Sequence, residues 1–312
     1  MNIFHNIGEV HNIDKAIVTI GTFDGVHLGH QALLNKMIDE AKANNQQTAV
    51  ITFYPHPRQV LNVDVAHLRF INTQKQKIER LEKCGIDNLI VIPFTHEFAQ
   101  TSSEQFIKEY IVNRLHPSKL IVGYDHHFGK NRLGDYTQLV ELGKQYNFKV
   151  EKIDIQTSEN IAISSTKIRN ALRQGNVSYA NSLLGYPYTL EGEVIEGNKI
   201  GRTIGFPTAN IDINPEYQII EVAGVYACYV VIGSEKFEGM ANIGLRPTIE
   251  KRENFILEVN IFNFNRDIYH QQVSVQLIER LRNEVKHQNL EKLKQQLCSD
   301  REQAIKLLSA NC

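Results

Sequence analysis

Apolar runs alternate with amphipathic stretches through the first half of the chain. Runs typical of buried strands occupy 16–20, 48–54, 88–93, 118–123 and 149–155, and apolar residues recur at helical spacing over 28–43, 73–84, 102–115 and 135–146. Regular alternation of strands and helices predicts a parallel sheet with helices on both faces, a doubly wound, Rossmann-like α/β domain. Such a sheet binds its ligands beyond the carboxyl ends of its strands.

The pattern changes near Gly185 and Pro187, where a helical stretch at 177–184 ends. Glycine and proline are typical of such a junction, so we expect domains at 1–184 and 185–312. Short strand-like runs then follow one another closely, at 190–195, 225–232, 236–243, 255–262 and 273–277, before a helical pattern at 290–308. This spacing predicts a small antiparallel β-barrel covered by one or two C-terminal helices, and therefore an α/β plus β chain.

Composition narrows the class of protein. A chain of 312 residues with 42 % apolar residues is large enough for two buried cores. Lys and Arg number 34 against 35 Asp and Glu, which gives no global reason to expect nucleic acid or an anionic membrane as partner. The four cysteines form no CxxC pair, and we see neither a signal-type N-terminus nor a run of membrane-spanning length. We expect a soluble, cytoplasmic protein with small-molecule partners, and the sequence leaves its oligomeric state open.

The clearest chemical signal in the first half is the stretch GTFDGVHLGH at 21–30, between a strand and a helix. Backbone N–H groups and the positive end of the helix dipole meet at such a turn, and glycines let an anion approach closely. The two histidines, three residues apart, add side-chain donors on one face. We therefore expect a phosphate site made by Gly21, Gly25, Gly29, His27 and His30. Phe23, within the same stretch, is assigned to nucleotide binding on the resemblance described below.

Other interpretations of this stretch are weaker or stay open. It contains neither GxGxxG nor GxxxxGK followed by Ser or Thr, so a dinucleotide fingerprint and a P-loop are both excluded. His27 and His30 can also be two zinc ligands, although a closed zinc site needs four ligands and none lies nearby in sequence. A pair of structural histidines is the remaining alternative.

Polar and glycine-rich segments follow other predicted strands of the same sheet. They are YPHP at 54–57, GYDHHFGKNRLGD at 123–135 and ISSTKIR at 163–169. The carboxyl ends of parallel strands share one edge of a sheet, so these segments should collect beside 21–30. Simple connecting loops would not need this bias, although His126 and His127 taken alone can be surface residues.

The segment ISSTKIR itself allows two interpretations. Ser164 or Ser165 can cap the helix that begins there, and Thr166, Lys167 and Arg169 place hydroxyl and cationic groups around its first turn. An ordinary capped helix with basic surface residues also explains the same residues. We favour phosphate donors because the segment is expected beside the loop at 21–30.

In the second half, the stretch GNKIGRTIGFPTAN at 197–210 carries the chemistry. Its glycines expose backbone to an anion, and the segment after the proline, if extended, directs two neutral oxygen-bearing side chains to one face. Such oxygens suit Mg²⁺ that keeps waters and bridges to phosphates. A glycine-rich hairpin explains the glycines but not PTAN. The candidates are Gly201, Arg202, Gly205 and Pro207 for nucleotide, and Thr208 and Asn210 for metal.

The first half resembles the nucleotidylyltransferase superfamily, whose HxGH signature is matched by HLGH at 27–30. The longer string GxFDGxHxGH resembles bacterial FAD synthetases, which join FMN to ATP and release pyrophosphate. The second signature, ISSTxIR, is matched from Ile163. This resemblance implies that the triphosphate is contacted by Ser164, Ser165, Thr166 and Arg169.

The third family string, GxDFxFG, is matched in part at 123–129, with His126 at the usual Phe position. On this resemblance we assign Asp125 to the nucleotide and Pro55, His56 and Phe128 to the flavin. The FMN phosphate is already anionic, so the expected reaction needs positioning and charge neutralisation rather than a strong base. His27, His30, Lys167, Arg169 and Mg²⁺ can supply these.

The second half is similar to riboflavin kinases through the motif GxxxGRxxGFPTAN at 197–210. GVYA at 224–227, NIGxxPT at 242–248 and a strand glutamate, Glu258, follow in the family's order. The resemblance implies that Glu258 is the general base that takes the proton of the terminal ribityl hydroxyl. The family strings HLLDF and DLYG are replaced at 260–264 and 267–270, so roles of the missing side chains do not transfer.

Together the two resemblances cover nearly the whole chain, in the order of bifunctional bacterial riboflavin kinase/FAD synthetases. They imply that the barrel makes FMN and ADP from riboflavin and ATP, that the α/β domain makes FAD and pyrophosphate from FMN and ATP, and that both reactions need Mg²⁺. One rival is another HxGH-type nucleotidylyltransferase with a non-catalytic flavin-binding second domain. The other is a flavin-sensing or RNA-binding regulator built on a decayed enzyme fold.

Overall fold

The computed structural model forms two compact units, Met1–Ser165 and Thr166–Cys312. It describes residues 1–11, 13–62, 68–124, 127–153, 157–158, 161–197, 200–213, 218–220, 222–246 and 254–310. The helices α7 (Ser165–Arg173) and α8 (Val177–Leu184) belong almost entirely to the second unit. The domain boundary expected at 184/185 stays a prediction.

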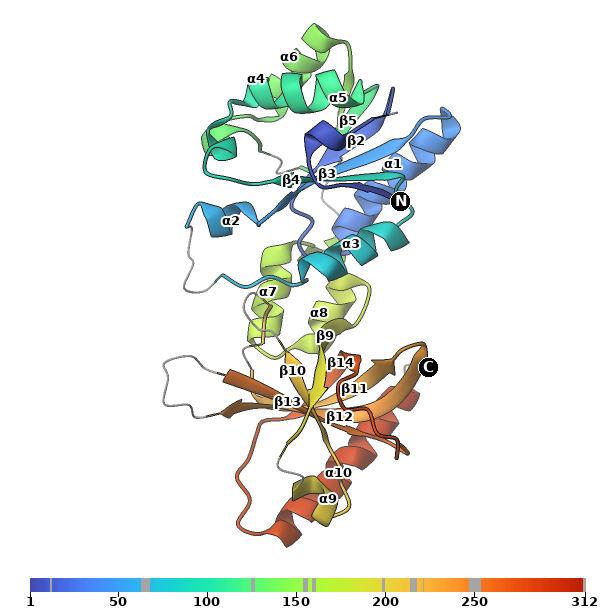
Figure 1. The fold of residues 1–312 in the computed structure, drawn as a ribbon, viewed down its shortest axis with the longest axis vertical. Helices are drawn as coiled ribbons and strands as arrows, with labels where there is room; N and C mark the ends of the chain where they lie inside the picture. Colours follow the sequence, from blue (N-terminus) through green and yellow to red (C-terminus); the bar gives the residue numbers. More distant parts are fainter. Residues whose placement is uncertain are drawn as a thin grey trace. The chain divides into compact units, whose positions relative to one another are not determined.

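The first unit is built on a six-stranded sheet in which all neighbouring strands are parallel (Figure 1). The strand order is β1-β4-β3-β2-β5-β6. The strands are β1 (Asn2–Phe4), β2 (Ile17–Ile20), β3 (Thr48–Tyr54), β4 (Asn88–Pro93), β5 (Lys119–Val122) and β6 (Lys149–Lys152). Strand β2 has β3 on one side and β5 on the other, so the order reverses there, and this is where such sheets bind ligands. The predicted parallel sheet is confirmed, and β1 is an addition that the apolar pattern did not indicate.

Helices cover both faces of this sheet, as expected for a doubly wound domain (Figure 1). Two separate apolar cores result, one under α1 and α3 and the other under η4 and α6. The helical elements are η1 (Ile7–Glu9), α1 (Leu28–Ala43), α2 (Pro57–Val60), α3 (Gln74–Lys83), η3 (Phe98–Gln100), α4 (Ser103–Gln105), η4 (Phe106–Val112), α5 (Asn113–Leu115), η5 (Lys130–Arg132) and α6 (Tyr136–Tyr146). A small ribbon, β7 (Thr157–Ser158) with β8 (Ile161–Ala162), completes the unit.

The prediction of a single α-helix at 102–115 is wrong in the middle of this range. Residues 106–112 form a π-helix, η4, between the short helices α4 and α5. Phe106 and Ile111, five residues apart, are both buried in the core. The wider turn of a π-helix brings side chains at this spacing onto one face, whereas an α-helix would separate them.

The second unit is a closed antiparallel barrel of order β10-β13-β12-β11-β14-β9, as predicted. Its strands are β9 (Tyr188–Ile195), β10 (Ala209–Ile213), β11 (Gly224–Ile232), β12 (Glu235–Arg246), β13 (Asn254–Ile261) and β14 (Gln272–Arg282). Strand β10 was not among the expected runs, and it closes the barrel by pairing with both β9 and β13. The short helix α9 (Ile200–Thr203) lies between β9 and β10.

One helix, α10 (Leu290–Ser309), accounts for the helical pattern at the end of the described chain. Its apolar side packs on the outer face of the barrel, where Ala304 and Leu308 join Met240 and Phe262 in one cluster. Arg282 of β14 holds the helix through Asp300, which is 1 % exposed; Nη2 lies 2.7 Å from Oδ2 and Nε lies 2.9 Å from Oδ1. This buried ion pair fixes the position of α10 along the barrel.

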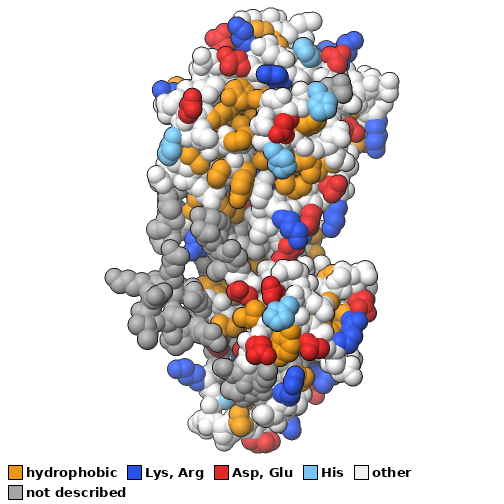
Figure 2. All heavy atoms as spheres, viewed as in Figure 1, with side chains coloured by type: hydrophobic (Ala, Val, Ile, Leu, Met, Phe, Trp, Pro, Cys, Tyr) orange, Lys and Arg blue, Asp and Glu red, His pale blue; other side chains and the backbone are white. Residues whose placement is uncertain are grey.

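Charged side chains of both signs are interspersed on the face drawn in Figure 2, with apolar side chains between them. This distribution agrees with the formal net charge of −1 at pH 7. On this face no single-sign field stands out that would steer a large polyanion.

Removing one partner of the Arg282–Asp300 pair should loosen α10. Asp300→Ala leaves a guanidinium without its carboxylate, and breaking a buried pair in this way costs about 3 kcal/mol. We expect hydrogen-exchange protection of the α10 amides in the full chain to fall accordingly. Glu302→Ala, an exposed position on the same helix, is the matched control and should leave protection unchanged. Equal protection in both variants would contradict this account.

Candidate active sites

The loop at 21–30 leaves β2 at the point where the strand order reverses. Its conformation is unusual because Phe23, Gly25 and Val26 have φ values of 50°, 88° and 35°. Phe23 and Val26 are 2 % and 1 % exposed, so they anchor this strained turn in the core beneath it. A Cβ on Gly21 would lie 3.1 Å from the Phe23 ring, which explains the glycine by packing.

The backbone N–H groups of this loop differ in what they can bind. Gly21 N–H donates to Ile51 O at 3.0 Å and so extends the sheet, which means that this N–H is not available to an anion. The N–H of Val26 donates to Phe23 O at 3.2 Å. The first turn of α1 carries the N–H groups of Leu28 and Gly29, and N–H groups at this position have no acceptor inside a helix. The N–H groups at the helix N-terminus are therefore the ones suited to an anion, and the contribution of Gly21 stays a prediction.

His27 and His30 lie together, but not as two outward donors. His27 is the N-cap of α1, and its Nδ1 accepts the His30 N–H at 3.3 Å. The two rings stack with centroids 3.7 Å apart and planes inclined by 15°. Among the described residues, the buried Nδ1 atom of His30 has no hydrogen-bond partner. Any contact of these rings with a phosphate therefore has to come from their Nε2 atoms.

Burial, and secondarily the neighbouring His27, lower the pKa of His30 well below its usual value. Two stacked imidazoles do not both carry charge easily, because like charges at this distance repel. The lowered pKa of His30 favours its neutral form and so disfavours a purely cationic histidine pair.

Two buried charged groups support the loop from the core side. Asp24 is 4 % exposed, and its Oδ1 accepts the N–H groups of Ile71 at 3.0 Å and Asn72 at 3.4 Å. Lys77 of α3 is 7 % exposed, and its ammonium faces the loop and the end of β3. Neither residue was singled out in the sequence, because one Asp in a glycine turn and one Lys in a polar helix carry no periodic signal.

Aromatic side chains gather at the carboxyl ends of β3 and β4. Phe53, Phe94 and Phe98 are half-buried, and their ring centroids lie 5.4 to 5.9 Å apart. Nearby along the chain, His56 caps α2 by accepting the Arg58 N–H at 3.1 Å and packs on Phe70, 4.6 Å away. The rings are inclined to one another by 43° to 82°, so this edge of the sheet offers an aromatic cluster rather than one flat face.

Phe128 lies in the core of the first unit, with 6 % of its surface exposed. Its N–H and carbonyl pair with Gly134, where a Cβ would meet the Phe128 oxygen at 2.8 Å. The glycine is thus needed for a tight turn. Asp125 and His126 lie outside the described residues.

The first half of the segment ISSTKIR contacts the loop at 21–30. Ser165 Oγ donates to the Asp24 carbonyl at 2.8 Å, so the two signatures meet inside the first unit. Thr166 and Lys167 are exposed and Arg169 is half-buried on α7, which the contacts assign to the second unit. Phosphate contacts by Ser164, Ser165, Thr166 and Arg169 stay predictions.

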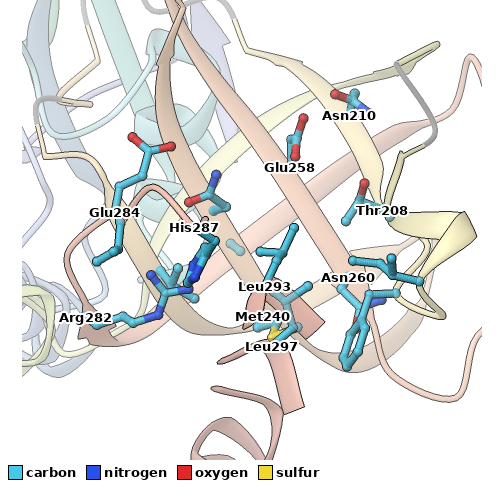
Figure 3. A pocket seen from close by; sticks show the side chains of 17 residues that line it. Thr208, Asn210, Met240, Glu258, Asn260, Arg282, Glu284, His287, Leu293 and Leu297 are labelled. Carbon is cyan, nitrogen blue, oxygen red and sulfur yellow. The ribbon is translucent and has the colours of Figure 1, made fainter. Parts of the chain in front are cut away.

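The second unit has a cavity of about 320 Å³ on the outer face of the barrel, under α10 (Figure 3). Thr208, Asn210 and Glu258 lie at one end, and Arg282 and Glu284 at the other. Its apolar wall is formed by residues including Ile204, Phe206, Met240, Leu293 and Leu297. One end is therefore suited to polar chemistry and the wall to a flat apolar group.

The pairing register of the strands fixes which side chains lie together at the polar end of the cavity. Glu258 on β13 lies directly opposite Asn210 on β10 and Asn242 on β12. Residues paired directly across antiparallel strands share one face, so a carboxylate stands between two amides on a rigid surface. Thr208, two residues before Asn210, lines the same cavity. The predicted association of Glu258 with Thr208 and Asn210 is thus present in the fold.

The loop that carries PTAN has its own supports. Gly205 has φ of 85° and follows the α9 turn, while Phe206 N–H donates to Gly201 O at 2.8 Å, the arrangement of a Schellman motif. A Cβ on Gly201 would lie 2.2 Å from Phe206 O. Asn260 of β13 donates from Nδ2 to Pro207 O at 2.7 Å. Asn260 thereby ties PTAN to the strand of Glu258, a link that the sequence did not reveal. Arg202, expected on the nucleotide side, is exposed on α9.

A metal would have to be held by oxygen atoms of mixed type. Among the described residues there is no group of three or more His, Cys, Asp or Glu side chains arranged for a metal ion. Thr208, Asn210 and Glu258 offer a hydroxyl, an amide oxygen and a carboxylate at one end of the cavity. Such hard ligands suit Mg²⁺ and do not suit zinc.

Two family models match the chain, one in each half. A model described as FAD synthetase matches residues 10–167, and a model described as riboflavin kinase matches residues 184–308. The first includes both histidines of the loop at 21–30, and the second includes the whole lining of the cavity.

Relatives of similar length carry both parts. A Haemophilus influenzae protein named bifunctional riboflavin kinase/FMN adenylyltransferase is 40 % identical over 303 residues, which cover 96 % of this chain and 97 % of the relative. A Buchnera aphidicola protein of the same name is 39 % identical over 301 residues, covering 94 % and 96 %. A Streptococcus pneumoniae crystal structure, described as a macrolide-efflux protein, is similar with a TM-score of 0.87 at 31 % identity and covers 96 % of this chain and 97 % of its own. Over the described part of this chain, every helix is too short or too polar to cross a membrane.

The neutral state of His30 predicts a pH dependence of stability. Because its pKa is lower in the folded state than the unfolded value of about 6.5, its contribution is complete above that pH and is lost as the pH falls. We expect the free energy of unfolding of the first unit to drop between about pH 7.5 and about pH 5, and to drop less in His30→Gln. Denaturant titrations of the full chain at both pH values measure this.

The control for this experiment is His5→Gln, an exposed histidine of the same unit. It should keep the full pH dependence of the unaltered chain. A His30→Gln variant with an unchanged dependence would show that the buried imidazole is not its source.

Proposed function

Because this chain belongs to the bifunctional riboflavin kinase/FMN adenylyltransferase family, we propose which of its residues perform each reaction. The enzyme phosphorylates riboflavin to FMN and adenylylates FMN to FAD, with ATP as the second substrate of both steps. The observation that carries the residue assignment is the row of Asn210, Glu258 and Asn242 across three strands at the polar end of the cavity.

In the kinase reaction Glu258 acts as the general base. The terminal ribityl hydroxyl of riboflavin approaches the carboxylate, which accepts its proton as the oxygen attacks the γ-phosphorus of ATP. The bond from that phosphorus to the bridging oxygen breaks, and ADP leaves. The apolar wall around Met240 and Leu293 seats the flavin ring, and the glycines at 201 and 205 with Arg202 and Pro207 form the nucleotide side.

The oxygen ligands described above fit a magnesium ion. Thr208 and Asn210 would hold it, near the phosphates of ATP. When bound, Mg²⁺ neutralises charge on the phosphoryl oxygens. Asn242, paired with Glu258 across the strands, places a neutral amide beside the carboxylate and adds no like charge there.

In the adenylyl transfer the FMN phosphate attacks the α-phosphorus of ATP and pyrophosphate leaves. No base is needed, because the attacking oxygen is already anionic. The N–H groups at the start of α1, with His27 and His30, donate to the phosphates, and Ser164, Ser165, Thr166 and Arg169 complete the site with Asp125 on the nucleotide. The aromatic edge near Phe53 supports flavin binding with Pro55, His56 and Phe128.

We place this enzyme in the cytoplasm, working on small molecules without a nucleic-acid partner. The near-zero net charge and the absence of a CxxC pair in the sequence support this assignment.

Replacing Glu258 should separate the two activities. Glu258→Gln removes the base but keeps size and polarity, so FMN formation from riboflavin and ATP should fall by about a hundredfold or more. FAD formation from added FMN should stay within about twofold, because Glu258 is not among the groups proposed for adenylyl transfer. Chromatographic quantification of FMN and FAD after incubation of the full chain with Mg-ATP measures both.

Glu193→Gln on β9 is the matched control, because this half-exposed glutamate contacts His270 and does not line the cavity. It should leave both activities unchanged. A loss of both activities in Glu258→Gln, or of neither, would contradict the proposed division.

A further inference from the structure

Lys77 is a buried lysine whose ammonium meets neutral oxygens. Its Nζ donates to Thr22 O at 3.4 Å, Thr52 Oγ1 at 3.3 Å and Phe53 O at 3.4 Å. Thr22 lies in the loop just after β2, and Thr52 and Phe53 lie at the end of the adjacent strand β3. Thr52 Oγ1 in turn donates to Thr22 O at 3.3 Å, so the Thr22 carbonyl is the shared centre of the group.

Keeping this charge in the interior is unfavourable for folding. Burial lowers the pKa of Lys77 to about 8, and nearby Asp24 partly opposes the shift. A methionine of similar length would fill the same space without losing the hydration of an ammonium. Packing alone therefore does not explain a lysine at this position.

What the ammonium does contact is the start of the phosphate loop. In a planar trans peptide the C=O and the next N–H point in opposite directions. Holding Thr22 O on the side of α3 turns the Phe23 N–H to the other side of the loop. The Phe23 backbone, with φ of 50°, is strained and needs such a restraint to persist.

Asp24 provides the second restraint from the same direction. Its bonds to the N–H groups of Ile71 and Asn72 tie the loop to the segment leading into α3. Lys77 and Asp24 therefore hold consecutive parts of the loop from below, and Ser165 holds the Asp24 carbonyl. The loop is fixed by its buried side, while the N-terminus of α1 stays available.

We propose that Lys77 is a positioning residue for the adenylyl transfer, acting through the Thr22 peptide to set the geometry in which the loop binds the phosphates of ATP. It does not touch the substrate. This inference rests on the proposed role of the loop at 21–30 in ATP binding. Within the described part of the chain, the charged group that faces Lys77 is Asp24 on the loop; from β3 it meets the Thr52 hydroxyl and the Phe53 carbonyl, which do not titrate in this range.

The test compares Lys77→Met and Lys77→Arg in the full chain. Lys77→Met should lower kcat/KM for ATP in FAD formation by about tenfold or more, with KM for FMN within about twofold. Lys77→Arg retains a donor that stays charged and should recover part of the loss. FMN formation, measured in the same preparations, should not change in either variant.

The pH profile separates positioning from mere packing. In the unaltered enzyme kcat/KM for FAD formation should fall as the pH rises past about 8, where Lys77 loses its proton. Lys77→Met should be low and lack this decline, and Lys77→Arg should also lack it. A Lys77→Met variant that keeps kcat/KM within twofold, retains the same decline, or has an unfolded first unit by hydrogen exchange would overturn the inference.

Two further variants distinguish a failure of the role proposed for Lys77 from a failure of the proposed ATP site. Lys75→Met on the same helix, with 71 % of its side chain exposed, is the matched control and should leave FAD formation unchanged. Gly25→Val forces a branched residue into φ of 88° and should abolish FAD formation if the loop binds ATP. An active Gly25→Val variant would refute the proposed ATP site, whereas its inactivity beside a fully active Lys77→Met would refute only the role of Lys77.

Discussion

The sharp turn between β2 and α1 is the constraint on which the first unit depends. It directs the N-terminus of α1 to the carboxyl edge of the sheet, and it places Phe23 and Val26 in left-handed conformations. The strain is held by burial of both side chains and by buried polar contacts from α3 and Ser165. The site is thus a local distortion that the surrounding core makes permanent.

In the second unit, strand pairing rather than a strained turn positions the polar groups. Its polar groups stand on β-strands whose hydrogen-bond register fixes which residues share a face. A slip of one residue between β10 and β13 would turn either Asn210 or Glu258 into the barrel, away from the cavity. The buried Arg282–Asp300 pair then holds α10 over this surface, so the cavity walls come from elements far apart in the sequence.

Much of this could be read in the sequence because the signals are local. The helix over 28–43 and the strand over 48–54 have the expected bounds, since each carries a periodic pattern within a single element. The motifs at 21–30 and 197–210 also lie within the two family matches, at 10–167 and 184–308. What failed was the middle of 102–115, where packing of Phe106 and Ile111 imposes a π-helix on residues of ordinary helical spacing, and β10, whose pairing is set by neighbours in space.

By itself the sequence determined the two-part organisation, the fold class of each part and the residue types available for phosphate and metal chemistry, because periodicity and motif spacing are properties of neighbouring residues. Only the tertiary structure decided that His27 caps α1 through its Nδ1, that the Gly21 N–H pairs with the sheet, and that Asn260 tethers PTAN. It also decided that Lys77 lies under a loop more than fifty residues away in the chain. These outcomes depend on hydrogen bonds and burial between distant segments, which no local pattern encodes.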